Sequence, residues 1–395
     1  MTADPSAALP APRLNVASLA AAIAAISVVG LGLALSIPLL AFELDTRGIS
    51  SSWIGLNTAV GGIATILCAP FLPDLVRRFG AGPMMMGAVV LGAASLLAFK
   101  VTDAFILWFP LRFLFGAALC VLFVVSEFWI NAAAPAGRRG LVIGVYATTL
   151  SLGFAGGPAV LSLVGTSGWA PYLIGAAFFG LASIPVMIGA SQAPVIEKEG
   201  SRGIVSLMRL APAATLAAFV FGAVETGLVN FLPLYGLRRG LGDGEAALLL
   251  TIAELGNVAF QIPLGLVSDR VDRRKLLLVC ALVGFGGAAL IPFLAIDSFA
   301  MAATMFTMTG IVCGMYTVGL ALLGARFHGA ALATANAAFV MLYSIGLIAG
   351  PVTVGAGMGV MGPDGFAFTL AAMLAFYVLV VAIQLVRDRS AASIP

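Results

Sequence analysis

The chain has 395 residues, of which 61% are hydrophobic and only 9% are charged. A soluble domain carries about 25% charged residues, so this chain could not cover itself with a wetted surface and is predicted to be an integral membrane protein. The formal net charge of +3 points to no nucleic-acid partner, because the basic residues form no long run.

Twelve apolar segments are long enough to cross a bilayer, since a spanning helix needs about 20 residues. In chain order they are 16–42, 51–72, 84–101, 104–130, 140–165, 168–190, 209–236, 245–267, 275–296, 299–324, 331–355 and 365–386. The longest connection, "SQAPVIEKEGSRGIVSLM", mixes both signs of charge. We therefore predict an all-α membrane protein with a tail at 1–15, a six-helix bundle at 16–190, a linker at 191–208, a second bundle at 209–386 and a tail at 387–395.

Basic residues predict the orientation of the spans. With the N-terminus in the cytoplasm, fifteen of the 20 lysines and arginines fall on the inner side, four fall on the outer side, and Arg112 lies within a span. We expect both termini and the linker in the cytoplasm, and the chain as a monomer in a bacterial inner membrane.

Several chemistries are not expected from this sequence. His328 is the single histidine, the four cysteines show no metal-like spacing, and no phosphate-binding Gly-rich loop of the Walker type is present. We expect no enzyme activity, no ATP-driven pumping, no metal and no cofactor.

The two halves of the chain repeat short motifs. "GFAGGP" ends at Pro158 and "GLIAGP" ends at Pro351, an offset of 193 residues. The loop after the second span, "PDLVRRFGAG", aligns with "GLVSDRVDRR" after the eighth span when Arg78 is matched to Arg270, an offset of 192. Repeats of this kind are typical of transporters whose substrate site lies between two related bundles.

These motifs resemble the major facilitator superfamily over nearly the whole chain. The loop motif of that family, G-x-L-a-D-R-x-G-R-R, is close to intact in the second half at Gly265, Asp269, Arg270, Arg273 and Arg274. In the first half Arg78 fits the motif, but Arg77 stands where the aspartate is expected, and Asp74, three residues earlier, is the candidate substitute. The resemblance implies a latch of charge pairs at the cytoplasmic helix ends.

Further motifs point to the same family. Arg112-x-x-x-Gly116 is similar to its fourth-helix arginine motif, and Gly144, Gly153, Gly157 and Pro158 match the fifth-helix motif associated with antiporters. Gly350 and Pro351 form the counterpart in the second half. The stretch "SEFWINAAAPAGRRG" resembles the YcaD-like branch. Glycines allow close helix approach and prolines permit bends, as gating helices require.

Four charged residues lie within the predicted spans and away from their ends: Arg112, Glu127, Glu225 and Glu254. Each costs at least ~2.5 kcal/mol at a helix centre, so such residues nearly always face the bundle interior or a wet cavity. We expect Glu225 or Glu254 to carry a proton, and Arg112 to tune that step or bind an anionic group. The alternative for Glu127 is a structural pairing with a cytoplasmic arginine.

Polar side chains extend this predicted site. Asn257 and Gln261 follow Glu254 at spacings of three and four, which places all three on one helical face. Asn336, Tyr343 and Gly350 recur every seven residues on a second helix. Tyr146, Asn230 and Tyr316 are further single candidates for substrate binding.

The predicted function is secondary transport of a small organic solute by alternating access, coupled to protons. The fifth-helix motif favours export of a drug or metabolite by antiport. The carboxylates and amides serve equally for uptake of a polar solute such as a sugar, vitamin or organic acid, and the first span lacks the acid that many multidrug antiporters carry. A non-transporting sensor is the third possibility.

Overall fold

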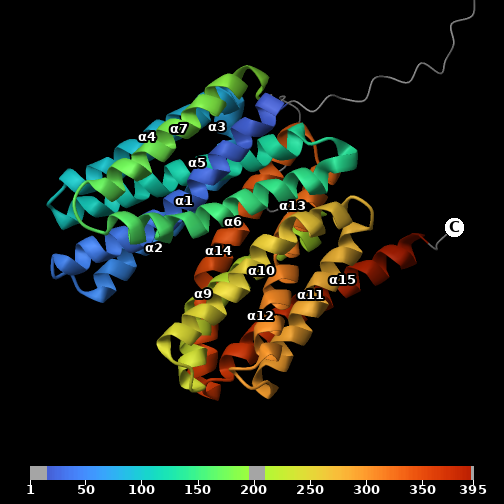
Figure 1. Cartoon of the computed structure of the whole chain (residues 1–395). Coiled ribbons are helices and arrows are strands. Elements are labelled where there is room, and N and C mark those ends of the chain that lie inside the picture. The colour runs from blue at the N-terminus through green and yellow to red at the C-terminus, as the bar shows by residue number, and fades with distance from the viewer. Residues whose placement is uncertain (1–15, 195–209, 393–395) are drawn as a thin grey trace, which may run out of the picture.

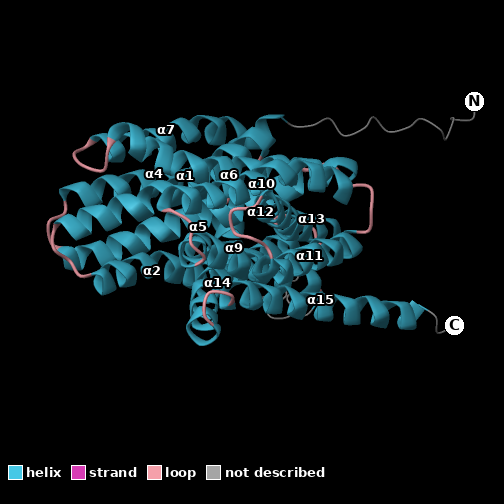
Figure 2. Ribbon diagram, turned by 60° about the horizontal axis from the view of Figure 1, so that its bottom comes forward, coloured by secondary structure: helices cyan, strands magenta, loops and turns pink. Residues whose placement is uncertain are grey.

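The computed structural model describes residues 16–194 and 210–392, and their regular structure is entirely helical (Figure 2). The predicted N-terminal tail, most of the predicted linker and the last three residues lie outside the described residues. Twelve helical segments in the described ranges are long and apolar enough to cross a membrane. The predicted all-α fold with twelve spans is confirmed.

The first half contains six spans. Its helices are α1 (Val16–Thr46), α2 (Ser51–Cys68), α3 (Leu72–Phe79), α4 (Ala81–Val101), α5 (Trp108–Ala133), α6 (Arg139–Val164) and α7 (Ala170–Gly189). A 3₁₀ turn at Ala69–Phe71 joins α2 to α3, so the two make one span.

The second half also contains six spans. Its helices are α9 (Pro212–Arg238), α10 (Asp243–Ser268), α11 (Arg273–Leu290), α12 (Phe299–Val312), α13 (Gly314–Arg326), α14 (Gly329–Met361) and α15 (Gly365–Ala392). Here α12 and α13 form one span that is interrupted near Cys313. The last helix, α15, continues past the predicted span end at 386, because backbone hydrogen bonding does not stop where apolar sequence stops.

One predicted loop is in fact helical. Asp74 and Arg78, expected in the loop after the second span, lie in α3. Pro73 in the first turn, an acidic residue near the N-terminus and basic residues near the C-terminus all favour a short helix there. The helix ends at Gly80, whose φ of +85° is strained for residues with a side chain.

The two halves form separate groups of helices in Figure 1, blue to green for α1–α7 and yellow to red for α9–α15. Because the connection between them falls largely outside the described residues, the predicted bundle limits, 16–190 and 209–386, remain predictions.

The repeated glycine–proline motif makes equivalent helix pairs in the two halves. In the first half α6 packs along α1, and in the second half α14 packs along α9. A methyl group on Gly153 would lie 2.9 Å from the Ser27 carbonyl oxygen, and one on Gly350 would lie 2.8 Å from the Thr226 hydroxyl oxygen. Glycine at these positions therefore allows each helix pair to approach closely.

The halves are fastened to each other at one end. We call the membrane side where α6 begins and α10 ends the latch side. There the backbones of Gly140 on α6 and Gly265 on α10 lie in contact, and a methyl group on Gly144 would lie 2.7 Å from the Gln261 carbonyl oxygen. The described hydrogen bonds between the two halves are donated by Asn131, Gly140, Leu141 and Tyr316. All four donors lie closer to the latch side than to the opposite side of the membrane.

Candidate functional site

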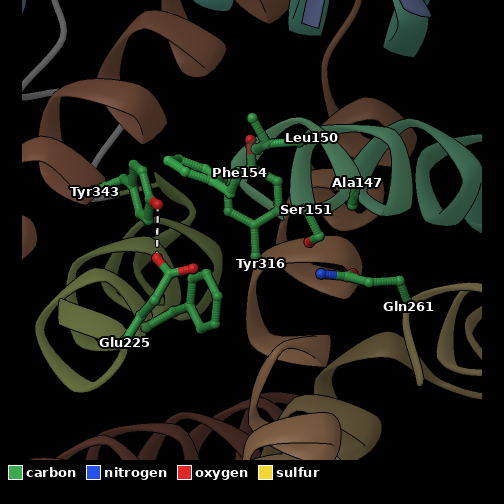
Figure 3. Close-up of a pocket in the computed structure, with 9 residues that line it drawn as sticks. Ala147, Leu150, Ser151, Phe154, Glu225, Gln261, Tyr316 and Tyr343 are labelled. Carbon is green, nitrogen blue, oxygen red and sulfur yellow. Dashed lines mark hydrogen bonds between the residues drawn. The ribbon is translucent and has the colours of Figure 1, made fainter. Parts of the chain in front are cut away.

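A small cavity lies between the two halves, near the middle of their helices (Figure 3). Both halves contribute to its wall. Its lining residues are Ala147, Leu150, Ser151 and Phe154 on α6, Phe221 and Glu225 on α9, Gln261 on α10, Tyr316 on α13, and Tyr343 on α14. We call it the Glu225 cavity.

Glu225 lies midway along α9 and is partly exposed to this cavity. The Tyr343 hydroxyl donates a hydrogen bond of 2.6 Å to its carboxylate, as the dashed line in Figure 3 shows. One turn before Glu225, Phe221 stacks on the Tyr343 ring with centroids 6.0 Å apart. The stacking and the hydrogen bond together hold the Tyr343 side chain between α9 and α14. The desolvation of the Glu225 carboxylate is therefore compensated by a neutral hydroxyl rather than by a cation.

The polar face of α10 forms a chain of hydrogen bonds. The Asn257 amide donates to the Glu254 carboxylate at 3.5 Å, and the Gln261 amide donates to the Asn257 side-chain oxygen at 3.2 Å. The Thr317 hydroxyl on α13 donates to the Gln261 side-chain oxygen. Glu254 and Asn257 share a second small cavity with Glu225, and Gln261 lines the Glu225 cavity. The structure thus brings both carboxylates and both amides together.

Glu127 is fully buried, and its partner comes from the other half of the molecule. The Tyr316 hydroxyl on α13 donates to one Glu127 oxygen, while the second oxygen has no hydrogen-bond partner in the described chain. Among the described residues no arginine pairs with Glu127, so the structure does not support the alternative of an arginine partner there. The arginines that follow Glu127 in sequence lie beyond the end of α5, whereas Tyr316 projects directly across the interface.

Three predicted binding residues do not line the cavities described so far. The Tyr146 hydroxyl is buried against Ser126, Asn230 is exposed and donates to the Thr226 carbonyl of its own helix, and Asn336 pairs with Asn131. Asn336 and Gly350 are 14 residues apart, or about 21 Å along a helix, so the whole face that they share with Tyr343 cannot reach one cavity. Of Asn336, Tyr343 and Gly350, only Tyr343 lines the Glu225 cavity.

A larger cavity of about 160 Å³ adjoins the first and contains Arg112. The two cavities share Phe154 and Tyr343 as wall residues. Arg112 on α5 is only 3% exposed, and it makes no hydrogen bond or ion pair with any described residue. We call this the Arg112 cavity.

The loop motif of the second half forms a latch, but not mainly through charge pairs. Asp269 accepts hydrogen bonds from the backbone N–H groups of Gly140 at 2.7 Å and Leu141 at 3.0 Å. These groups belong to the first turn of α6, where unpaired N–H groups and the helix dipole favour an anion. The ion pair is local, because Arg273, at the start of α11, lies 3.1 Å from Asp269 across the turn that joins α10 to α11. Arg270 is exposed, and Arg274 lies in the first turn of α11.

The first-half motif does not make the equivalent contact. Asp74 is largely exposed and pairs with Arg77 at 2.9 Å within α3, and Arg78 stacks over the neighbouring Phe79 ring. The latch among the described residues is therefore asymmetric. Arg77 occupies the position of the usual aspartate, and Asp74 stands three residues earlier, about one helical turn away along α3.

The sequence analysis missed several residues of this site. Phe221 lines the Glu225 cavity, Thr317 donates a hydrogen bond to Gln261, and Ser36 lines the Arg112 cavity. Asn131, which joins the halves, follows Glu127 by four residues, a spacing that places both on one helical face and could have been noticed. No comparable signal marks Ser36 or Phe221, because serine and phenylalanine are ordinary in a spanning helix.

A family model described as Major Facilitator Superfamily matches residues 17–248 and 214–395. The chain belongs to the Major Facilitator Superfamily. The uncharacterized MFS-type transporter YfkF of Bacillus subtilis is 27% identical over 341 residues, covering 84% of this chain and 86% of YfkF. YcaD of Escherichia coli, also named as an uncharacterized MFS-type transporter, is 22% identical over 281 residues, covering 70% of this chain and 72% of YcaD.

Solved structures of this superfamily share the fold. The fucose:proton symporter FucP of E. coli superimposes with a TM-score of 0.77 at 16% identity, covering 94% of this chain and 99% of FucP. Membership of the superfamily supports a membrane-spanning secondary transporter, and it confirms the predicted family.

Proposed function

We propose that this superfamily member moves a small organic solute by alternating access, coupled to protons, with Glu225 as the main proton carrier. The observation that carries this proposal is the bond between Glu225 and Tyr343, which joins α9 to α14 inside a cavity between the halves. A carboxylate within the membrane is costly when charged, and desolvation favours its neutral form. A proton on Glu225 removes the charge and changes what Tyr343 can bind.

A chain of contacts from the Glu225 cavity to the latch side supports coupling between proton binding and opening of the molecule. Tyr316 and Tyr343 both line the Glu225 cavity, and their rings lie 5.6 Å apart. Tyr343 bonds to Glu225, while Tyr316 bonds to Glu127 across the interface. A solute or proton that moves one tyrosine therefore acts on a contact that holds the halves together. Glu254, with its amide chain along α10, is the second candidate carrier.

The proposal includes an orientation. We place the latch side in the cytoplasm of a bacterial inner membrane, because the sequence predicts fifteen basic residues for the side of the termini and the linker and four for the other. The matched relatives are bacterial, and one chain encloses both cavities, as a monomeric transporter requires. A reporter fused to the C-terminus that is active only in the cytoplasm checks this orientation.

The test uses purified protein in liposomes that contain a pH-sensitive dye. We expect an imposed solute gradient to drive proton movement for one class in a panel of metabolites and drugs. Glu225→Gln should abolish the proton signal, because the amide cannot exchange a proton. Glu245→Gln is the matched control, since Glu245 is an exposed carboxylate at the start of α10 that bonds only locally.

The sign of the proton signal distinguishes the directions. Protons that move with the solute indicate symport, and protons that move against it indicate antiport. Solute flux without any proton signal would refute the coupling, and solute binding without flux under any gradient would favour the sensor. An unchanged signal in Glu225→Gln with loss in Glu254→Gln would move the carrier to α10.

A further inference from the structure

The most unusual group in the molecule is Arg112. Its side chain is nearly fully buried, its Nη1 atom has no hydrogen-bond partner, and no described carboxylate lies within ion-pair distance. A buried guanidinium normally pairs with an acid, because an isolated charge in a low-dielectric site costs several kcal/mol. No described residue therefore balances the charge of this cation.

A second donor in the same cavity also lacks a partner. Ser36 on α1 is 1% exposed, lines the Arg112 cavity, and its hydroxyl makes no hydrogen bond in the described chain. The two threonines on the wall, Thr58 and Thr65, differ because each hydroxyl donates to a carbonyl of its own helix. Two unused donors, one of them charged, thus face a single cavity.

Most of the remaining wall is apolar, although Cys120, Tyr343 and Ser344 also line it. Phe115, Leu119, Phe123, Phe154 and Leu347 surround the space between α1, α5, α6 and α14. A cavity of about 150 Å³ with such a lining accommodates benzene, and this one measures about 160 Å³. The shape and lining therefore fit one aromatic ring or an apolar group of similar size.

We propose that the Arg112 cavity binds an organic monocarboxylate with an apolar body of about one aromatic ring. This inference rests on the proposed transport function and names its substrate class. A carboxylate matches the planar fork of a guanidinium with two parallel hydrogen bonds, and a single charge balances the single arginine. The anion and the proton on Glu225 would occupy adjoining cavities, which share Tyr343 as a wall residue.

The test compares three ligands of nearly the same shape by calorimetric titration of the purified protein in detergent. The ligands are benzoate, which is anionic, benzamide, which is neutral, and benzamidine, which is cationic. We expect benzoate to bind at least about 30-fold more tightly than benzamide, because a buried charge pair is at stake, and benzamidine not to bind. This comparison requires no variant.

Variants then locate the binding. Arg112→Met should weaken benzoate binding about 30-fold or more, and Ser36→Ala should weaken it about tenfold. Arg138→Met, which removes an exposed arginine outside the cavities, should change nothing. Without ligand, Arg112→Met should be as thermally stable as the wild type or more so, because it removes an uncompensated buried charge.

Three results would overturn the inference: no benzoate binding by the wild type at millimolar concentration, equal binding of benzoate and benzamide, or unchanged benzoate binding in Arg112→Met. The proposed proton coupling is tested separately, since Glu225→Gln should still bind benzoate. Specific benzoate binding together with proton-independent flux would refute the coupling and leave the substrate class standing.

Discussion

At the scale of single residues, the membrane-embedded charges are compensated in different ways. Glu225 and Glu127 each accept a hydrogen bond from a tyrosine on another helix. Arg112 has no such partner among the described residues. Neutral hydroxyl partners leave a carboxylate free to gain and lose a proton, whereas a tightly paired arginine would hold it charged. This difference in partners supports the proposed proton exchange at the acids and the proposed anion binding at the arginine.

The Glu225–Tyr343 bond can be tested by Tyr343→Phe. A donor to a carboxylate favours its charged form, so removal of the hydroxyl makes protonation easier. A hydrogen bond to a charged group contributes about 1.5–3 kcal/mol, and we expect the pH at half-maximal transport to rise by roughly one unit. The measurement is proton-coupled flux in liposomes over a series of pH values.

The matched control for this substitution is Tyr172→Phe. Tyr172 is also a buried tyrosine, but it lies on α7 and its hydroxyl has no hydrogen-bond partner in the described chain. Loss of the Tyr172 hydroxyl should leave the pH dependence of transport unchanged. A profile that does not move in Tyr343→Phe would show that this bond does not govern proton binding.

At the scale of helices, the repeated glycine–proline motif builds the packing around the site. The α1–α6 pair in the first half and the α9–α14 pair in the second are close-packed through glycines, and each of α6 and α14 carries an internal proline. The Glu225 cavity lies between α6 on one side and the α9–α14 pair on the other. Changes in either helix pair therefore alter the shape of the site.

Gly157→Ala tests this packing. A methyl group there would lie 2.5 Å from the Leu35 backbone nitrogen on α1 and 2.6 Å from the Ala34 side chain, so the helices must separate. We expect the free energy of unfolding to fall by about 1–3 kcal/mol, with reduced transport. Gly180→Ala on α7 is the control, because a methyl group there meets nothing within 4 Å. Equal thermal stability of the two variants would contradict the packing role.

At the scale of the whole molecule, the halves are fastened on the latch side. Asp269 on α10 caps the first turn of α6, and Asn131 and Tyr316 add bonds nearer the cavity. Alternating access requires these contacts to break when the molecule opens on this side. Asp269 of the second-half motif makes the contact between the halves, whereas Asp74 of the first-half motif bonds only within its own helix.

Asp269→Asn should shift the molecule towards opening on the latch side. Loss of the charge weakens two charge-assisted hydrogen bonds, each worth about 1.5–3 kcal/mol, which corresponds to at least about tenfold in the equilibrium between conformations. Spin labels at the exposed positions Arg138 and Val271, one on each half, should report a larger population of long distances.

The control for the latch is Asp272→Asn. Asp272 belongs to the same motif, but it accepts hydrogen bonds only from the first turn of α11 and does not reach the other half. In the Asp272→Asn variant, the distribution of distances between the spin labels should match that of the wild type. Identical distance distributions in Asp269→Asn and the wild type would show that Asp269 does not hold the two halves together.

The sequence by itself determined the properties that one helix carries alone. Apolar length predicted twelve spans, because the bilayer imposes a minimum helix length. The cost of charge in the membrane singled out Arg112 and the three glutamates, and a spacing of three and four placed Glu254, Asn257 and Gln261 on one face, where they are hydrogen-bonded in series. The α2–α3 connection was predicted less well, because its helix is short and polar.

Only the tertiary structure decided which helices meet and which charges find partners. Tyr343 lies 118 residues from Glu225, and Tyr316 lies 189 residues from Glu127. No periodicity within one helix relates residues so far apart, since such contacts depend on crossing geometry and close packing at glycines. For the same reason the sequence could place Arg112 in the membrane but could not show that its partner is missing, and that missing partner is what points to an anionic substrate.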